Sequence, residues 1–298
     1  MKRKTILLSA LLLFLLCLLL LFPMLSLEGV KSGLILWGLT LVPVLFPFFL
    51  VTGLMKIFIP ASDTPFFYVA LGVLSGYPVG ASLLSTSENP KIRSDFYLGL
   101  ISNPSPAFLL TFVAEHTLSL GSKKIYFYLL ILVSSLLGNL IANHFLPPIY
   151  PISCKNKILK KKNSSPDEAK TGETQMSIVL DNVLWGSIVT LLKIGGYVML
   201  FSIIARFLLL IPIKNEFVHI ILSGIFELTT GISLLGNSSL IITQKIVPAA
   251  LLCSFGGLCS VLQIQSVIGG SGLSIFNYII RKLLSSVVAV ILAFIFFR

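Results

Sequence analysis

The fold of this chain is decided by one stretch, Leu71-Gly72-Val73-Leu74-Ser75-Gly76-Tyr77-Pro78-Val79-Gly80-Ala81-Ser82, which lies inside an apolar run from Phe66 to Ser87. The run could enter a bilayer, but its middle cannot stay helical. Pro78 removes a backbone donor and clashes with the preceding turn, while Gly76 and Gly80 lose more conformational entropy in a helix than other residues do. Broken backbone persists at membrane depth only where protein or a wet cavity satisfies its polar groups. We therefore predict a polar break inside the membrane, where secondary transporters bind substrates; the alternative is a proline-kinked span with no ligand role.

The composition indicates a membrane protein. Of the 298 residues, 56% are hydrophobic and 11% are charged, and the mean hydropathy is +0.99. A soluble protein could not hide that much apolar surface, and several stretches approach the roughly 20 apolar residues that span a bilayer. We predict an all-α polytopic membrane protein with the lipid bilayer as its partner and the cell membrane as its location.

Charge and motifs exclude other classes. The net charge of +11 does not indicate nucleic-acid binding, because the Lys and Arg residues lie between apolar segments, where they set topology. The four cysteines and three histidines show neither metal-ligand spacing nor a disulfide framework. No motif of a serine hydrolase, a zinc protease or a nucleotide-binding loop occurs. We expect no enzyme, no metal site and no cofactor beyond a coupling proton or sodium ion.

The apolar runs divide the chain into four parts. Residues 1–32 are expected to hold an uncleaved helix, Thr5 to Phe22, and a loop. Because the run from 176 to 210 is too long for one straight span, Gly195-Gly196 is expected to interrupt it. The remaining parts are a first repeat at 33–147 with a hairpin at 66–87, a basic cytoplasmic linker at 148–175, and a second repeat at 176–298 with a hairpin at 217–235.

The two repeats are recognised by a shared order of features. Leu36-Trp37-Gly38 recurs 148 residues later as Leu184-Trp185-Gly186. Ser75–Gly80 falls on Phe226–Gly231, 151 residues later, and Asn103–Pro106 falls at the same offset on Ser254–Gly257. A kinked span, a broken run, an interrupted span and a plain span therefore occur twice.

Loop charge predicts that the repeats are inverted. If every apolar run crossed the membrane, the Lys-rich loop at 150–175 would lie outside, against the positive-inside rule. If residues 66–87 form a re-entrant hairpin, that loop returns to the cytoplasm and residues 217–235 become a hairpin that enters from the other side. Ten residues of hairpin arm make about 15 Å of helix, enough to reach the bilayer midplane. The predicted fold is an inverted repeat with two re-entrant hairpins and discontinuous helices.

These stretches carry a family resemblance. Ser75–Ala81, Asn103–Pro106, Phe226–Ile232 and Ser254–Gly257 resemble the nucleoside-recognition (Gate) domain family. Within it they look like the integral membrane proteins of sporulation, the group of the stage V dipicolinate transporter, and the order is distantly similar to concentrative nucleoside transporters. The resemblance spans roughly residues 33–297. It departs at Ser82, where the family pattern leads us to expect Lys, so an anion contact made by that Lys is missing here.

The resemblance implies alternating-access transport of a small anionic or nucleoside-like molecule, with dipicolinate during sporulation as one candidate, across the plasma membrane or the outer forespore membrane. The alternative function is a non-transporting membrane scaffold or spore maturation factor with the same fold. A solvent-sized cavity between the breaks would favour transport, and a packed, dry centre would favour the scaffold. A homo-oligomer is compatible with both.

The polar side chains in the breaks have competing interpretations. Thr229, Thr230, Asn103 and Ser105 could bond either freed backbone or a ligand, and Gln263 could bind a ligand or only bond a neighbouring helix. Glu227 is a carboxylate in an apolar run, which is costly in a membrane. It could hold a coupling ion, take a proton or bind a substrate donor, or it could only bond exposed hairpin backbone. Tyr77 could stack on an aromatic ligand or anchor the hairpin tip by its hydroxyl. The predicted substrate-binding residues are Gly76, Tyr77, Pro78, Gly80, Asn103, Ser105, Glu227, Thr229, Thr230, Gly256, Gly257 and Gln263.

Overall fold

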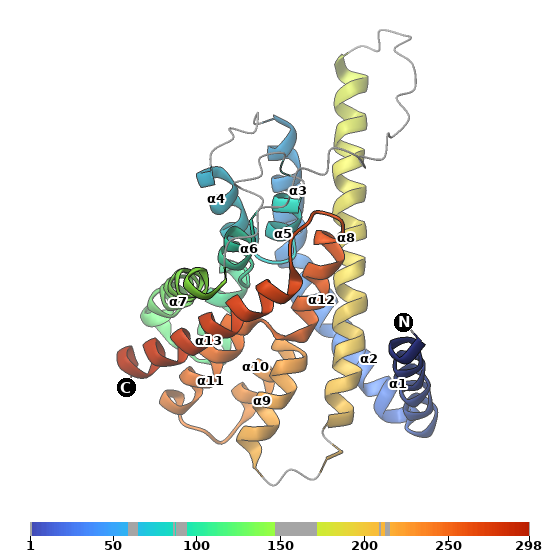
Figure 1. Ribbon diagram of the computed structural model, residues 1–298, viewed down its shortest axis with the longest axis vertical. Helices are drawn as coiled ribbons and strands as arrows, with labels where there is room; N and C mark the ends of the chain where they lie inside the picture. The colour runs from blue at the N-terminus through green and yellow to red at the C-terminus, as the bar shows by residue number, and fades with distance from the viewer. Residues whose placement is uncertain are drawn as a thin grey trace.

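The computed structural model describes residues 2–58, 65–85, 87, 94–146, 172–208, 210–211 and 215–297. Within these ranges the chain is helical throughout, without a strand (Figure 1). Five helical segments are long and apolar enough to cross a membrane, which confirms the predicted all-α polytopic class. They are Pro23–Leu41, Gly121–Phe145, Met176–Leu208, Ile242–Ile268 and Ile275–Phe296. The predicted linker at 148–175 lies outside the described residues, apart from the start of the helix that follows it.

Two long helical segments pack side by side along the molecule (Figure 1). The first joins α2 (Pro23–Ile35), a π-helical segment η1 (Leu36–Leu41) and α3 (Val42–Phe58) without a break, and follows α1 (Lys2–Leu21). The second is α8 (Gly172–Leu208). At Gly29 an added Cβ would lie 2.7 Å from the Ile203 backbone, so the glycine permits the close approach. The segment 23–32, expected to be a loop, is helical because Pro23 starts α2 at a position that tolerates proline.

The expected interruption of α8 at Gly195-Gly196 is wrong. The helix is continuous over 37 residues, about 55 Å at 1.5 Å per residue. An added Cβ at Gly195 would lie 2.7 Å from the Trp37 ring, so this glycine makes room for the indole. Each glycine costs about 1 kcal/mol of helix propensity, and packing against the first long segment offsets that cost.

The two broken runs are helical hairpins. The first consists of α4 (Pro65–Ser75) and α5 (Val79–Ser85), joined by Gly76-Tyr77-Pro78, and the second of α9 (Glu216–Phe226) and α10 (Leu228–Asn237), joined by Glu227. An added Cβ at Gly80 would lie 3.2 Å from the Gly72 Cα, and one at Gly231 would lie 2.2 Å from the Gly224 Cα. The arms of each hairpin therefore touch backbone to backbone.

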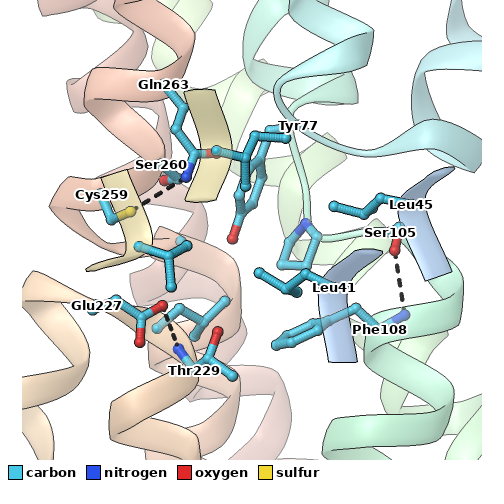
Figure 2. A pocket seen from close by; sticks show the side chains of 15 residues that line it. Leu41, Leu45, Tyr77, Ser105, Phe108, Glu227, Thr229, Cys259, Ser260 and Gln263 are labelled. Carbon is cyan, nitrogen blue, oxygen red and sulfur yellow. Dashed lines mark hydrogen bonds between the residues drawn. The ribbon is translucent and has the colours of Figure 1, made fainter. Parts of the chain in front are cut away.

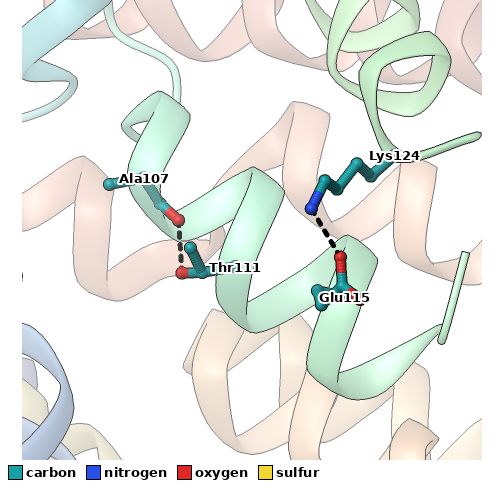
Figure 3. A network of polar contacts seen from close by, with 4 residues as sticks. All are labelled: Ala107, Thr111, Glu115 and Lys124. Carbon is teal, nitrogen blue, oxygen red and sulfur yellow. Dashed lines mark hydrogen bonds and ion pairs between the residues drawn. The ribbon is translucent and has the colours of Figure 1, made fainter. Parts of the chain in front are cut away.

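Each hairpin is followed by an interrupted helix and a plain one. The first interrupted helix is α6 (Asp95–Ile101), a break at 102–105 and the π-helical η2 (Phe108–Thr117); the plain helix α7 (Lys124–Phe145) follows the short η3 (Gly121–Lys123). The second pair is α11 (Ile242–Phe255) with α12 (Gly257–Ile268), then α13 (Ile275–Phe296). In η2, the Thr111 hydroxyl donates to the Ala107 carbonyl at 2.6 Å, and Glu115 forms an ion pair with Lys124 at 2.7 Å (Figure 3).

The element bounds repeat at one offset. Both ends of α4 and α9 are separated by 151 residues, as are both ends of α7 and α13 and the last residues of η2 and α12. The buried faces of α7 and α13 match at the same offset, as Phe127 with Tyr278 and Ser134 with Ser285 show. These element bounds therefore share the 151-residue offset of the repeated sequence motifs.

Three apolar clusters form the core. One lies between η2, α7, α9, α10, α11 and α13, a second between α5, α6, α12 and α13, and a third mainly between α3 and α8. Phe108 belongs to the first cluster and Leu45 to the third, while Tyr77 packs against the second. The site described next lies where the three meet.

Candidate substrate-binding site

The tip of the first hairpin is docked on the first helix break. The Tyr77 N–H donates to the Asn103 carbonyl at 3.0 Å. Gly76 has φ +69°, and an added Cβ there would lie 2.6 Å from the Ser105 nitrogen. Glycine is therefore required here by both the left-handed backbone and the close approach.

The second break is docked on the second hairpin in a comparable way. An added Cβ at Gly257 would lie 3.1 Å from the Gly224 carbonyl oxygen and 3.3 Å from the Leu228 nitrogen. At Gly256 it would lie 3.5 Å from Cε1 of Tyr77, which joins the second break to the first hairpin. The structure thus brings together all four breaks of the helical pattern.

The four breaks border a central cavity of about 50 Å³ (Figure 2). At 10–15 Å³ for each water, it has room for roughly three to five water molecules. We call this space the central cavity; its lining residues are Leu41, Leu45, Tyr77, Pro104, Ser105, Phe108, Ile194, Val198, Glu227, Leu228, Thr229, Gly256, Cys259, Ser260 and Gln263.

Glu227 caps α10 and also borders the central cavity. Its carboxylate accepts from the Thr229 N–H at 3.0 Å and from the Thr230 N–H at 2.5 Å, and the residue is 3% exposed. Both N–H groups belong to the first turn of α10 and have no partner within that helix, so the side chain satisfies two backbone donors. Across the described part of the chain the one ion pair is Lys124 with Glu115, so Glu227 is held by amides rather than by a cation. The backbone role is thus present, and the position at the cavity leaves a substrate or ion role open.

The other polar side chains of the central cavity are also partly engaged. Ser105 Oγ accepts from the Phe108 N–H at 3.3 Å, and the Ser260 hydroxyl donates to the Gly257 carbonyl at 2.8 Å. Gln263 Nε2 donates to Cys259 Sγ at 3.2 Å. Figure 2 shows the Tyr77 phenol pointing into the space between Glu227 and Leu41. These contacts orient the side chains while leaving oxygen lone pairs toward the cavity.

Half of the predicted substrate-binding residues line the central cavity, namely Tyr77, Ser105, Glu227, Thr229, Gly256 and Gln263. The other six surround it. Gly76 and Gly257 hold a hairpin tip and a break together, and Gly80 permits the contact of α4 with α5. Asn103 lies in the first break, where its side chain binds Lys282, and the Thr230 N–H donates to the capping carboxylate of Glu227. Pro78 lines a neighbouring cavity instead.

Two buried cations were missed by the sequence reasoning, which counted them with the charged helix flanks. Arg281 and Lys282 are fully buried in α13. Lys282 Nζ donates to Asn103 Oδ1 at 2.8 Å, and Arg281 donates to the Asn139 carbonyl at 3.1 Å and to Asn143 Oδ1 at 2.8 Å. The repeat offset supplies the missed signal, because the positions 151 residues earlier, Leu130 and Ile131, lie on the buried face of α7. The aliphatic side of the central cavity was missed as well, since Leu41, Leu45, Ile194 and Val198 carry no polar signal.

Comparisons with known proteins give one distant relative. The chain is 23% identical to the sporulation integral membrane protein YlbJ of Bacillus subtilis (strain 168) over 341 residues, which covers 97% of this chain and 82% of the relative. No family model and no solved structure matches. The chain is therefore a multi-pass integral membrane protein with distant homology to a sporulation membrane protein, in line with the sporulation resemblance.

Proposed function

We propose that this protein is an alternating-access transporter of a small polar solute, built as an inverted repeat with two re-entrant hairpins and discontinuous helices. The observation that carries the proposal is the meeting of four helix breaks around the central cavity. Each break carries backbone groups that its own helix does not satisfy and that lipid cannot satisfy. Secondary transporters place their substrate sites at such breaks, at the interface of their repeats.

The lining of the central cavity supports a site at the interface of the two repeats. Three pairs of lining residues are separated by the same 151 residues that separate the elements: Tyr77 with Leu228, Ser105 with Gly256, and Phe108 with Cys259. Equivalent positions from two repeats face one space when the axis that relates the repeats passes through it. A site on the repeat interface is the arrangement that alternating access uses.

The chemistry of the lining narrows the substrate class. The 15 lining residues include one carboxylate and neither Lys nor Arg. A bare dianion such as dipicolinate would meet Glu227 without a facing cation, so a proton or sodium ion would have to travel with it. A neutral nucleoside-like solute needs no such compensation, and Tyr77 offers it a ring to stack on. We therefore favour a neutral polar solute.

A non-transporting scaffold or spore maturation factor is the second candidate. The observation in its favour is the size of the central cavity, since about 50 Å³ is far below the 300–1,000 Å³ of ordinary ligand pockets. Under the transport proposal the hairpins must separate to admit the solute. The homology to a sporulation membrane protein is compatible with both candidates.

Uptake into proteoliposomes separates the two candidates. The purified protein is reconstituted and supplied with radiolabelled uridine or dipicolinate, with and without inward proton or sodium gradients. We expect saturable uptake of uridine that exceeds empty liposomes, and dipicolinate uptake only with a gradient. Lack of uptake of both solutes under every gradient would support the scaffold.

A further inference from the structure

A second cavity, of about 350 Å³, lies between α3, α5, α8 and α12. Its lining includes Phe49, Val79, Ser82, Ser187, Thr190 and Val267. No charged residue is among the lining side chains. Its volume falls within the range of small-molecule pockets, unlike that of the central cavity. We call it the outer cavity, a name that refers to its position relative to the four breaks and not to the outside of the cell.

The outer cavity continues the central one by a single helical turn. Three helices line both cavities with residues four positions apart. Leu45 of α3, Ile194 of α8 and Gln263 of α12 line the central cavity, and Phe49, Thr190 and Val267 of the same helices line the outer cavity. Four residues along a helix return to the same face about 6 Å away. At the first hairpin the change is from Tyr77 to Pro78 and Val79. One layer of side chains therefore separates the two cavities along all four elements.

Two hydroxyl groups of the outer cavity, those of Ser187 and Thr190, present acceptors. The Ser187 hydroxyl donates to the Val183 carbonyl at 2.7 Å, and the Thr190 hydroxyl donates to the Gly186 carbonyl at 2.8 Å. With their protons committed to backbone, both oxygens can accept from a solute. Phe49 and Val79 supply apolar surface beside them, and an added Cβ at Gly186 would meet open space.

The other end of the central cavity is filled. Trp37 lies two turns before Leu45 in the same helical segment, packs against Gly195 and donates its indole N–H to the Leu191 carbonyl at 2.8 Å. Phe201, one turn beyond Val198 in α8, is 6% exposed and belongs to the apolar cluster of α3 and α8. Trp37 and Phe201 therefore pack at this end, whereas one layer of side chains separates the central cavity from the outer cavity.

We infer that the outer cavity is a second binding site, in series with the central one, for a neutral solute with N–H or O–H donors and one apolar face. Phe49, with Leu45 and Val79, forms the layer that the solute passes to reach the central cavity. The inference rests on the proposed transport function, but the tests below measure thiol labelling and require no transport. The second binding site and the transport function can therefore be contradicted independently.

The first test asks whether the outer cavity is open to water. Ser187→Cys is introduced into a chain whose native cysteines are replaced by alanine, and open membranes are treated with a membrane-impermeant methanethiosulfonate. Leu192→Cys, on the same helix and 57% exposed on another face, is the matched control. We expect Ser187→Cys to react at least roughly tenfold faster, because the thiolate forms in water and not in lipid. Thr190→Cys replaces it if that variant does not accumulate. Equal rates would overturn the inference.

The second test asks whether the cavities are in series, with the native Cys259 of the central cavity as the sole thiol. Phe49→Ala removes side-chain volume between the cavities, and Phe201→Ala removes the same volume from the filled end. We expect the Phe49 variant to speed Cys259 labelling and the Phe201 variant to leave it unchanged. The reverse result, or no change with either, would show that the path does not run through the outer cavity.

Filling the outer cavity should have the opposite effect. Gly186→Leu directs a side chain into the cavity, while Gly196→Leu makes the same change on the same helix at a second glycine whose Cβ would also meet open space. We expect slower Cys259 labelling with Gly186→Leu alone. Equal slowing by both leucines would contradict the inference.

The solute class is tested by protection of Ser187→Cys. We expect millimolar uridine, a neutral solute with N–H and O–H donors, to slow labelling, and dipicolinate at the same concentration to leave it unchanged, because no cation lines the outer cavity. Protection by dipicolinate but not by uridine would overturn the proposed class. Protection by neither would remove the binding site and leave at most a passage.

Discussion

Glu227 combines two duties at one position, because it caps α10 and borders the central cavity. Glutamine keeps the length of the side chain but has one acceptor oxygen in place of two. We expect Glu227→Gln to weaken the cap by about 1 kcal/mol and still allow the protein to accumulate. If Glu227 handles a proton or ion, uptake into proteoliposomes should be lost.

The matched control for this change is Glu216→Gln. Glu216 is an exposed carboxylate in the first turn of α9, on the same hairpin. We expect it to fold and transport like the parent. Parental uptake by Glu227→Gln as well would remove the ion-handling role and leave the carboxylate with its cap alone.

Lys282 offers a second prediction at the residue scale. Its fully buried ammonium is hydrogen-bonded to Asn103, whose backbone carbonyl holds the first hairpin tip. Asn103→Ala leaves the buried amino group without this partner, so we expect a loss of roughly 1–3 kcal/mol of stability. Lys282→Met removes the charge itself and should cost far less. In the double variant most of the loss should be recovered.

The double-mutant cycle is read from thermal unfolding in detergent, with Leu283→Met, which is 50% exposed on the same helix, as the control. The coupling free energy between Asn103 and Lys282 decides whether the buried Lys282 side chain depends on Asn103. Additive losses would show that the ammonium does not depend on Asn103.

At the scale of elements, the hairpins depend on glycines at the contact of their arms. An added Cβ at Gly231 would lie 2.2 Å from the Gly224 Cα, whereas at Gly236 in the same helix it would lie 3.1 Å from the Thr117 methyl group. Overpacking against backbone costs about 1–3 kcal/mol or more. We expect Gly231→Ala to lower the unfolding temperature markedly and Gly236→Ala to change it little. Similar unfolding temperatures for the two variants would contradict the backbone contact of α9 and α10.

The elements also show what the sequence could reveal. Gly76, Pro78 and Glu227 predicted both hairpin tips, because each is costly inside an apolar helix. Gly195 misled by the same logic, since its lack of a side chain serves the Trp37 ring rather than a break. A glycine that ends a helix and one that admits a neighbour look alike without the neighbour. Lys282 was missed for a related reason: a cation seven residues from a helix start reads as a flank until its burial is known.

At the scale of the whole molecule, the proposed inverted repeat predicts on which side of the membrane each loop lies. Ser164 lies in the basic linker, outside the described residues, and Ser239 is an exposed residue between α10 and α11. The proposed topology places the first in the cytoplasm and the second outside, because positive loops stay inside. In intact cells an impermeant thiol reagent should label Ser239→Cys and spare Ser164→Cys. Inverted vesicles should show the opposite pattern. Labelling of Ser164→Cys from outside would overturn the topology.

The two tryptophans of the repeated Leu-Trp-Gly motif lie in different environments. Trp37 is packed against Gly195, while Trp185 is 68% exposed and the neighbouring Gly186 borders the outer cavity. If the halves are inverted copies, the equivalent tryptophan of each half can adopt the environment of the other. Exchanging the two environments would pack Trp185 against the protein, expose Trp37 and open the central cavity at the end that Trp37 now fills. Under the proposed inverted repeat, the environment of each tryptophan therefore predicts the environment of the other in a conformation that opens to the opposite side of the membrane.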